Sequence, residues 1–332
     1  MAQARNGGTT WKNDTARSRL SMKRIGKRPA EKMTQQNDCV FGPNVKPIAT
    51  VSPGEVVEIE TYDCFAGTVR PERDLKAFLE SGEELFENPV TGPIYVEGAE
   101  PGDTLVAEIQ SIELGERGAT TTVPGFGILE GWFTPIPPIS KFSQIKDGMV
   151  AYPVSKDKSV KFPVRAMIGT IGVAPATETI TTVTPSRHGG NLDTRYVTVG
   201  NRIHLPVNVR GALFAVGDAH AAQGAGEVCG TSVEVAAVVR VKLELVKGKR
   251  IDWPRIESPE EMMTVCSARP LEDAARLAVR ELMKWLLVDY GLLEYDAYML
   301  LSVAGDVEIM QMVDPMYTVV AKIKKSVLSQ LK

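Results

Sequence analysis

The sequence predicts a mainly β protein, with a β-sandwich or barrel-like body and a C-terminal α+β unit. Three observations predict this class. Short β-branched runs bounded by turn residues recur between Val45 and Arg250. Apolar and polar residues alternate over 233–245, which is typical of a strand, and apolar residues over 271–290 have helical spacing.

The first residues of the chain form a basic arm. Residues 1–32 contain nine basic residues against two acidic ones, with few apolar residues and no period, so we expect disorder there. One interpretation is a transit peptide or tethering arm, and the other is an upstream extension with Met33 as the working start. The remaining chain divides into a β-rich body over 33–255 and an α+β unit over 256–332.

The composition limits the class of protein. With 332 residues, 43% hydrophobic content and a net charge of −3, the chain is typical of a globular protein and shows no sign of a nucleic-acid partner. Its most apolar helical stretch, 274–288, is broken by charged residues, so we expect a cytoplasmic protein without a membrane partner. The four cysteines form no CxxC pair, which argues against a structural zinc knuckle and a disulfide framework.

Turn residues mark the first strands. Pro-Gly pairs at 53–54 and 101–102 come just before β-branched runs at 56–61 and 104–109. The segment 123–138 is so rich in proline and glycine that no regular element is expected in it. It is either an irregular crossing or a mobile lid.

The strongest strand and helix lie in the second half of the chain. The strand over 233–245 has apolar residues at its odd positions, and it directly follows the glycine-rich segment 224–230, which is therefore a loop held on a strand. The helix over 271–290 is amphipathic, with proline before it and glycine after it. We expect a second short helix over 294–303 and β-like structure over 307–313.

One candidate site includes Asp218 and His220. Two residues apart, their side chains share one face of an extended chain, and Glu227 follows after a loop that glycines can fold back over that face. Carboxylate and imidazole together can bind a divalent ion such as zinc, which activates water, while a nearby carboxylate moves the proton. The alternative is a turn whose polar side chains bond the local backbone.

A second candidate is the run that begins at His188. It places an imidazole, a carboxamide and a carboxylate around two glycines: His188, Gly189, Gly190, Asn191 and Asp193. In a functional interpretation His188 or Asp193 binds metal, and Asn191 or the backbone amides of the glycines bind a substrate oxygen. The alternative is a hydrogen-bonded turn between strands.

Cys229 is a rival nucleophile. Its thiolate, next to Glu227 and within reach of a histidine, could attack a carbonyl carbon, whereas an inert core cysteine is the alternative. Glu234, on the polar face of its strand, points either at the site or at solvent. His204 has apolar neighbours and is interpreted as structural.

Several motifs together resemble the acetamidase/formamidase family. The resemblance is carried by 188–194, 205–207, 211–224 and 226–231, with support from 63–67, 91–99, 124–127 and 311–314. One departure lies inside the central run: the family's Gly-Asp-Gly-Glu is here Gly224-Ala225-Gly226-Glu227.

The resemblance implies hydrolysis of short linear amides, such as formamide or acetamide, to a carboxylate and ammonia. It also implies a divalent metal, with zinc expected and calcium or manganese as alternatives, and assembly into a homo-oligomer. The expected residues are catalytic Glu227, His220 and Asp193, metal ligands His188, Asp218 and His220, and substrate-binding Asn191, Gly189 and Gly190. The alternatives are a metal-free amidase with Cys229 as nucleophile, and a non-catalytic small-molecule-binding relative, which the Ala225 departure motivates.

Overall fold

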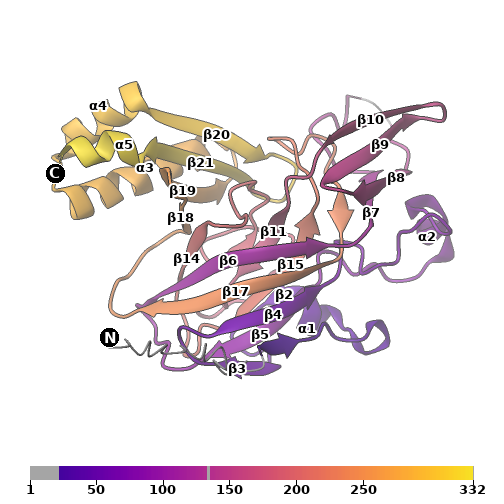
Figure 1. Ribbon diagram of the computed structural model, residues 1–332, viewed down its shortest axis with the longest axis horizontal. Coiled ribbons are helices and arrows are strands. Elements are labelled where there is room, and N and C mark those ends of the chain that lie inside the picture. The colour runs from indigo at the N-terminus through magenta and orange to yellow at the C-terminus, as the bar shows by residue number, and fades with distance from the viewer. Residues whose placement is uncertain (1–21, 133–134, 332) are drawn as a thin grey trace, which may run out of the picture.

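The computed structural model describes residues 22–132 and 135–331, which form a β-sandwich with helices near the C-terminus (Figure 1). Within them, the first sheet has the strand order β1-β4-β17-β6-β14-β18-β19-β21-β20. These nine strands are β1 (Lys23–Ile25), β4 (Val56–Thr61), β17 (Ala237–Val246), β6 (Thr104–Leu114), β14 (Arg202–Pro206), β18 (Arg255–Glu257), β19 (Glu261–Ala268), β21 (Tyr317–Lys324) and β20 (Gly305–Gln311).

The second sheet has ten strands within the described ranges and carries the site. Its main path is β10-β9-β8-β7-β16-β15-β11-β13, and β5 pairs with both β15 and β3. These strands are β10 (Lys158–Pro163), β9 (Met149–Ser155), β8 (Ile139–Lys146), β7 (Arg117–Thr122), β16 (Glu234–Val235), β15 (Phe214–His220), β11 (Met167–Gly172), β13 (Gly189–Asn191), β5 (Val90–Val96) and β3 (Ala49–Val51). A small separate pair joins β12 (Ile180–Thr181) to β2 (Val40–Phe41).

Helices are fewer and mostly lie at the C-terminal end of the chain (Figure 1). Among the described helices, none combines the length and apolar character that a membrane crossing requires. The helices are α1 (Gln35–Asp38), α2 (Leu75–Ser81), α3 (Leu271–Tyr290), α4 (Glu294–Ala304) and α5 (Lys325–Leu328), with 3-10 turns η1 (Ala30–Lys32) and η2 (Ser329–Leu331).

The main hydrophobic core lies between the two large sheets. Each buried aliphatic or aromatic side chain there stabilises the fold by about 1.5–3 kcal/mol relative to exposure. One sheet contributes Val57, Ile59, Leu105, Val239 and Val241, and the other contributes Ile94, Ile168, Ile171, Phe214 and Val216. The predicted mainly β body is therefore confirmed as a two-layer arrangement.

The strand predicted over 233–245 is divided between the sheets. β16 belongs to the sheet that carries the site, whereas β17, which is separated from β16 by Ala236 alone, lies in the other sheet. The predicted alternation holds in β17, where Ala237, Val239, Val241 and Leu243 are buried. The change of sheet leaves Glu234 paired with the end of β15, at the site.

The C-terminal unit predicted over 256–332 contains the expected helices. α3 spans Leu271–Tyr290, as predicted, and packs its apolar face on β19 and β21. Its chain reverses at Gly291, whose φ of 66° is unstrained for glycine. The strands of this unit continue the nine-stranded sheet, so the body and the unit share one sheet.

The basic arm differs from expectation in its described part. Residues 23–25 form β1, which pairs in parallel with β4, and Arg24 lies 2.6 Å from the carboxylate of Glu60. Disorder was therefore the wrong prediction for this part, because backbone pairing with β4 needs no apolar period. Residues 1–21 lie outside the described residues.

Candidate active site

The site is built where β15 ends beside β16. His220 is the last residue of β15, and it lies directly opposite Glu234 in the antiparallel pairing of the two strands. Asp218 precedes His220 by two residues, and its Oδ1 lies 3.2 Å from His220 Nε2. The predicted Asp218–His220 pair therefore exists, and Glu234 points at the site rather than at solvent.

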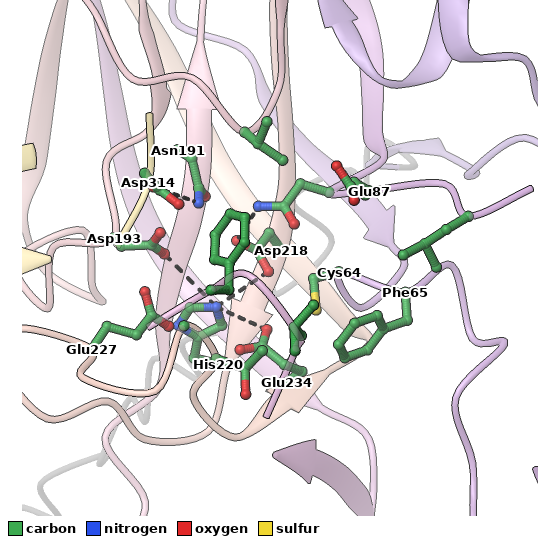
Figure 2. A pocket seen from close by; sticks show the side chains of 17 residues that line it. Cys64, Phe65, Glu87, Asn191, Asp193, Asp218, His220, Glu227, Glu234 and Asp314 are labelled. Carbon is green, nitrogen blue, oxygen red and sulfur yellow. Dashed lines mark hydrogen bonds and ion pairs between the residues drawn. The ribbon is translucent and has the colours of Figure 1, made fainter. Parts of the chain in front are cut away.

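Five buried carboxylates, one imidazole and the exposed carboxylate of Glu87 line a cavity of about 70 Å³ (Figure 2). Loops bring in the members that β15 and β16 do not carry: Asp193 follows β13, Asp314 follows β20, and Glu227 lies in the loop between β15 and β16. In Figure 2, Asp193, Glu227 and Asp314 lie on one side of His220, and Cys64 lies on the other. Chain segments distant in sequence thus surround one small space.

His220 is held by contacts at both ring nitrogens. Its Nε2 lies 3.0 Å from Oε2 of Glu234 and 3.9 Å from Oδ1 of Asp193. Its Nδ1 lies 2.9 Å from Oε1 of Gln223, whose Nε2 donates to the carbonyl oxygen of Asp193 at 2.6 Å. Because that amide nitrogen must donate, its oxygen faces Nδ1, so Nδ1 carries a proton and Nε2 faces the carboxylates.

Four polar residues of the site have left-handed backbone conformations. The φ angles are 48° at Asn88, 41° at Asp193, 56° at Asp218 and 44° at Glu227. Non-glycine residues seldom adopt such angles, and clusters of them mark sites where the surrounding fold maintains strain. Asn88 donates its side-chain amide to Oδ2 of Asp218 at 3.1 Å, which shows one such residue supporting another.

Gly169 in β11 leaves the space that two carboxylates occupy. A Cβ atom at this position would lie 2.4 Å from Oδ2 of Asp218 and 2.5 Å from Oδ1 of Asp193. Both separations are below the 3.0 Å that real Cβ atoms respect. Any larger residue would therefore displace at least one of the two carboxylates.

Burial determines the protonation of the cluster. It raises the pKa of Asp193 and Asp314 well above the ordinary value and raises that of Glu234 to about 8. Burial also raises the pKa of Glu227. Without a counter-charge, a buried group of acids thus retains protons.

In two members of the cluster, His220 and Asp218, neighbouring charges outweigh the effect of burial on the pKa. Burial disfavours the charged form of His220, but the carboxylates of Glu234 and Asp218 outweigh it and raise the pKa of the imidazole well above its usual value. Burial likewise opposes ionisation of Asp218, yet His220 and hydrogen bonds to that carboxyl lower its pKa. His220 and Asp218 therefore behave as an ion pair.

The charge of the cavity fits a bound cation. Among the described residues that line it, no lysine or arginine balances the six acids. Oδ1 of Asp193 is buried without a hydrogen-bond partner, which is costly for such a group, and Oε2 of Glu234 meets only the ring of His220. Two sets of ligand atoms each lie within 4.8 Å of one another: Asp193 with His220 and Glu227, and Cys64 with Asp218 and Glu234.

The predicted roles of His188, Gly189 and Gly190 find no support in their positions. His188 is buried against Phe41, with 5.1 Å between ring centroids, and it neither lines the cavity nor joins either set of ligand atoms. The amide of Gly189 donates to the carbonyl oxygen of Ser186 at 3.1 Å. Both glycines serve close packing instead, since a Cβ at Gly189 would lie 2.2 Å from the carbonyl oxygen of Ile171 and one at Gly190 would lie 2.4 Å from that of Thr184.

Asn191 does line the cavity, as predicted for a residue that contacts substrate. Its Nδ2 donates to Oδ2 of Asp314 at 2.9 Å, and its Oδ1 accepts from Thr170 at 2.6 Å. These contacts fix the orientation of the carboxamide and use one of its two N–H groups. The second N–H group is the one that a substrate oxygen would engage.

Cys229 and Ala225 lie outside this cavity. Both line a neighbouring cavity of about 460 Å³, and the thiol of Cys229 faces the carbonyl oxygen of Thr231 at 3.3 Å. Ala225 is exposed, so the carboxylate that the family pattern has at this position would not enter the smaller cavity.

Sequence reasoning missed Cys64, Asn88, Gln223 and Asp314 as members of the site. Cys64 and Asp314 stand inside the weaker supporting motifs at 63–67 and 311–314, which was the available signal for them. Burial raises the pKa of the Cys64 thiol well above its ordinary value, so this thiol stays protonated. Asn88 gave no signal beyond a turn-rich segment.

Comparison with known proteins shows the family to which the chain belongs. The model of the Acetamidase/Formamidase family matches residues 26–181 and 176–328. The acetamidase of Yersinia enterocolitica is 36% identical with a TM-score of 0.83, covering 92% of each chain, and that of Bacillus halodurans is 35% identical with a TM-score of 0.82, covering 93% of this chain and 99% of the other. The formamidase of Methylophilus methylotrophus is 25% identical over 257 residues, 62% of this chain, and the match spans 63% of that relative, less than two thirds of its length.

Proposed function

Because this chain belongs to the acetamidase/formamidase family, we propose that it hydrolyses small linear amides, such as formamide or acetamide, to a carboxylate and ammonia. The observation that carries the proposal is the cavity around His220, which combines a surplus of buried carboxylates with room for only a small molecule. The names of the relatives support amides as the substrate class. The size of the cavity supports short acyl groups.

We propose that the site binds a divalent metal, with zinc as the first expectation and calcium or manganese as alternatives. Asp193 and His220 would hold it, with the carboxylate of Glu227 within 4.8 Å of both as the base beside the ion. Asp218, predicted as a ligand, belongs to the adjoining set with Glu234 and Cys64. The unpartnered Oδ1 of Asp193 supports a cation. A bound divalent ion supplies Lewis acidity, which activates water and polarises the amide carbonyl.

Within this proposal, the residues of the chain position and move protons. Glu227 accepts the proton of the attacking water and transfers it to the leaving nitrogen, and its buried carboxyl, with a raised pKa, suits both steps. Ser232 donates to Oε1 of Glu227 at 2.6 Å, which leaves Oε2 for the proton. Gln223 fixes one proton of His220 on Nδ1, so Nε2 is the nitrogen that would give up its proton and offer a lone pair to a bound metal.

Neither alternative is favoured by the geometry. A nucleophilic Cys229 would have to act from the neighbouring cavity, while the cysteine inside the reaction cavity, Cys64, has a raised pKa that keeps it a thiol. The non-catalytic alternative was motivated by Ala225, which does not line the reaction cavity.

An exposed apolar face supports the expected homo-oligomer. Its residues lie on α3, on α4 and the residue before it, and on β20, and exposed apolar side chains in such number are typical of an interaction surface. They are Val288, Leu293, Tyr295, Tyr298, Met299, Val303, Val307 and Ile309. Light scattering on the purified protein would measure the mass, and a monomer at micromolar concentration would contradict this part of the proposal.

The decisive experiment joins metal content to turnover. Purified full-length protein should release ammonia from formamide or acetamide, and its metal content should approach one or more ions per chain by elemental analysis. Glu227→Gln should fold normally and release ammonia about 10²–10⁴-fold more slowly. If the wild-type protein released no ammonia from any small amide with zinc, calcium or manganese supplied, the proposed function would be wrong.

A further inference from the structure

The reaction cavity has a polar floor and a mostly apolar mouth. The five buried carboxylates and His220 form the floor, whereas the mouth is made by half-buried apolar side chains from separate chain segments, together with the exposed carboxylate of Glu87. Those side chains are Leu85, Val123, Phe126 and Val183, and the buried Phe65 also lines the cavity.

This division orients an amide substrate. The –NH₂ group of a primary amide donates two hydrogen bonds, and the floor offers a surplus of carboxylate acceptors. An alkyl group placed among those carboxylates would bury polar oxygens without partners, which is costly. The amide nitrogen therefore faces the floor, and the acyl chain faces the mouth.

The cavity volume limits how long that acyl chain can be. A water-sized group needs about 10–15 Å³ of such volume, so 70 Å³ admits roughly five groups. An amide of about propionamide size fills this space. A longer acyl chain must displace a side chain at the mouth.

Phe126 is fixed at the mouth by its own contacts and by those of its loop. Its backbone N–H donates to the carbonyl oxygen of Val123 at 3.0 Å, and Ile128 donates to the carbonyl oxygen of Val228 at 3.0 Å. Its ring packs against Gly230, where a Cβ atom would lie only 3.1 Å from Cδ1 of the ring. The loop that carries Glu227 thus also fixes the aromatic ring at the mouth.

We infer that Phe126 and Val183 set the upper limit of acyl-chain length, so that amides up to propionamide are accepted and longer linear amides are excluded. This inference rests on the proposed amide hydrolysis. Replacing Phe126 by a small residue extends the acyl space, and enlarging Val183 shortens it. The two side chains come from separate segments, so they test the mouth independently.

The experiment measures kcat/KM for formamide, acetamide, propionamide, butyramide and hexanamide. Phe126→Ala should raise the ratio of hexanamide to acetamide by about tenfold or more, the size of effect that a few methylene groups produce in an apolar pocket. Val183→Phe should lower the ratio of propionamide to formamide by about tenfold. Leu129→Ala is the matched control, because Leu129 is exposed on the same loop as Phe126 and does not line the cavity.

The outcomes separate this inference from the proposed function. If the wild-type protein hydrolyses no amide, both are overturned. If it hydrolyses short amides but neither variant changes the chain-length ratios relative to Leu129→Ala, only the inference is overturned. Should Phe126→Ala fail to fold by circular dichroism, Val183→Phe decides alone. Wild-type activity that is equal on hexanamide and acetamide also contradicts the inference.

Discussion

The side-chain amide of Gln223 connects His220 to Asp193: Oε1 lies 2.9 Å from Nδ1 of His220, and Nε2 donates to the carbonyl oxygen of Asp193 at 2.6 Å. Gln223→Leu should lower metal affinity or kcat/KM by about 10–100-fold, since it removes the acceptor that fixes the imidazole. Gln223→Glu keeps that acceptor and should recover part of the loss.

The control for this prediction is Gln144→Leu on β8, which replaces an exposed glutamine far from the cavity lining. Nitrogen NMR shifts of the His220 ring give a readout that a general loss of stability would not move. An unchanged Nδ1–H tautomer in Gln223→Leu, with normal turnover, would show that Gln223 has no positioning role.

Gly169 gives a steric test of the carboxylate pair. Gly169→Ala should reduce kcat/KM by at least about 10²-fold, because the new methyl group must displace Asp218 or Asp193 from the reaction cavity. Gly224→Ala is the control, since Gly224 lies in the site loop but has no atom within 4 Å of an added Cβ. Equal activity of the two variants in an ammonia-release assay would contradict the prediction.

Much of the fold could be predicted because local periodicity records which face of an element is buried. The helix over 271–290 and the alternation in β17 follow directly from such patterns. The change of sheet at Ala236 could not be predicted, because Val235 and Ala237 are both buried and the alternation continues across it. β1 was also missed, since its pairing with β4 uses backbone groups that every sequence has.

The site could be predicted only where its residues are close in sequence. Asp218, His220 and Glu227 share one segment, and Asp193 belongs to a polar glycine-rich run, so composition and spacing identified them. Asp314 joins them through tertiary packing, which spacing along the chain does not encode. His188 had the same local signals as Asp193, but its ring packs on Phe41 instead.

Cys229 separates two chemical mechanisms. Cys229→Ala should retain kcat/KM within about twofold, because the thiol lies in the neighbouring cavity and faces the carbonyl oxygen of Thr231. A thioester mechanism requires that the same variant lose all turnover. The measurement is single-turnover ammonia release, and loss of activity in a folded Cys229→Ala variant would favour the cysteine nucleophile over activated water.

The buried acids predict how the stability of the metal-free protein depends on pH. The pKa of Glu234 is raised by burial to about 8, above about 4.3 in an unfolded chain, so between these values the folded state binds more protons than the unfolded state. The stability that this group contributes is therefore present below about pH 4.3 and is lost as pH rises toward 8. The raised pKa of His220 likewise makes the free energy of unfolding fall as pH rises. The lowered pKa of Asp218 has the opposite effect, but only in more acidic solution.

Urea denaturation after chelation should accordingly show a free energy of unfolding that falls between pH 5.5 and 8.5. Glu234→Gln should flatten this slope, because a carboxamide does not titrate, while Glu72→Gln at an exposed position should leave it unchanged. Adding zinc should restore stability most strongly at the alkaline end, where the acids are ionised and the cation replaces their protons. A metal-free protein that became more stable with rising pH across this window would contradict the proposed balance of charge in the cavity.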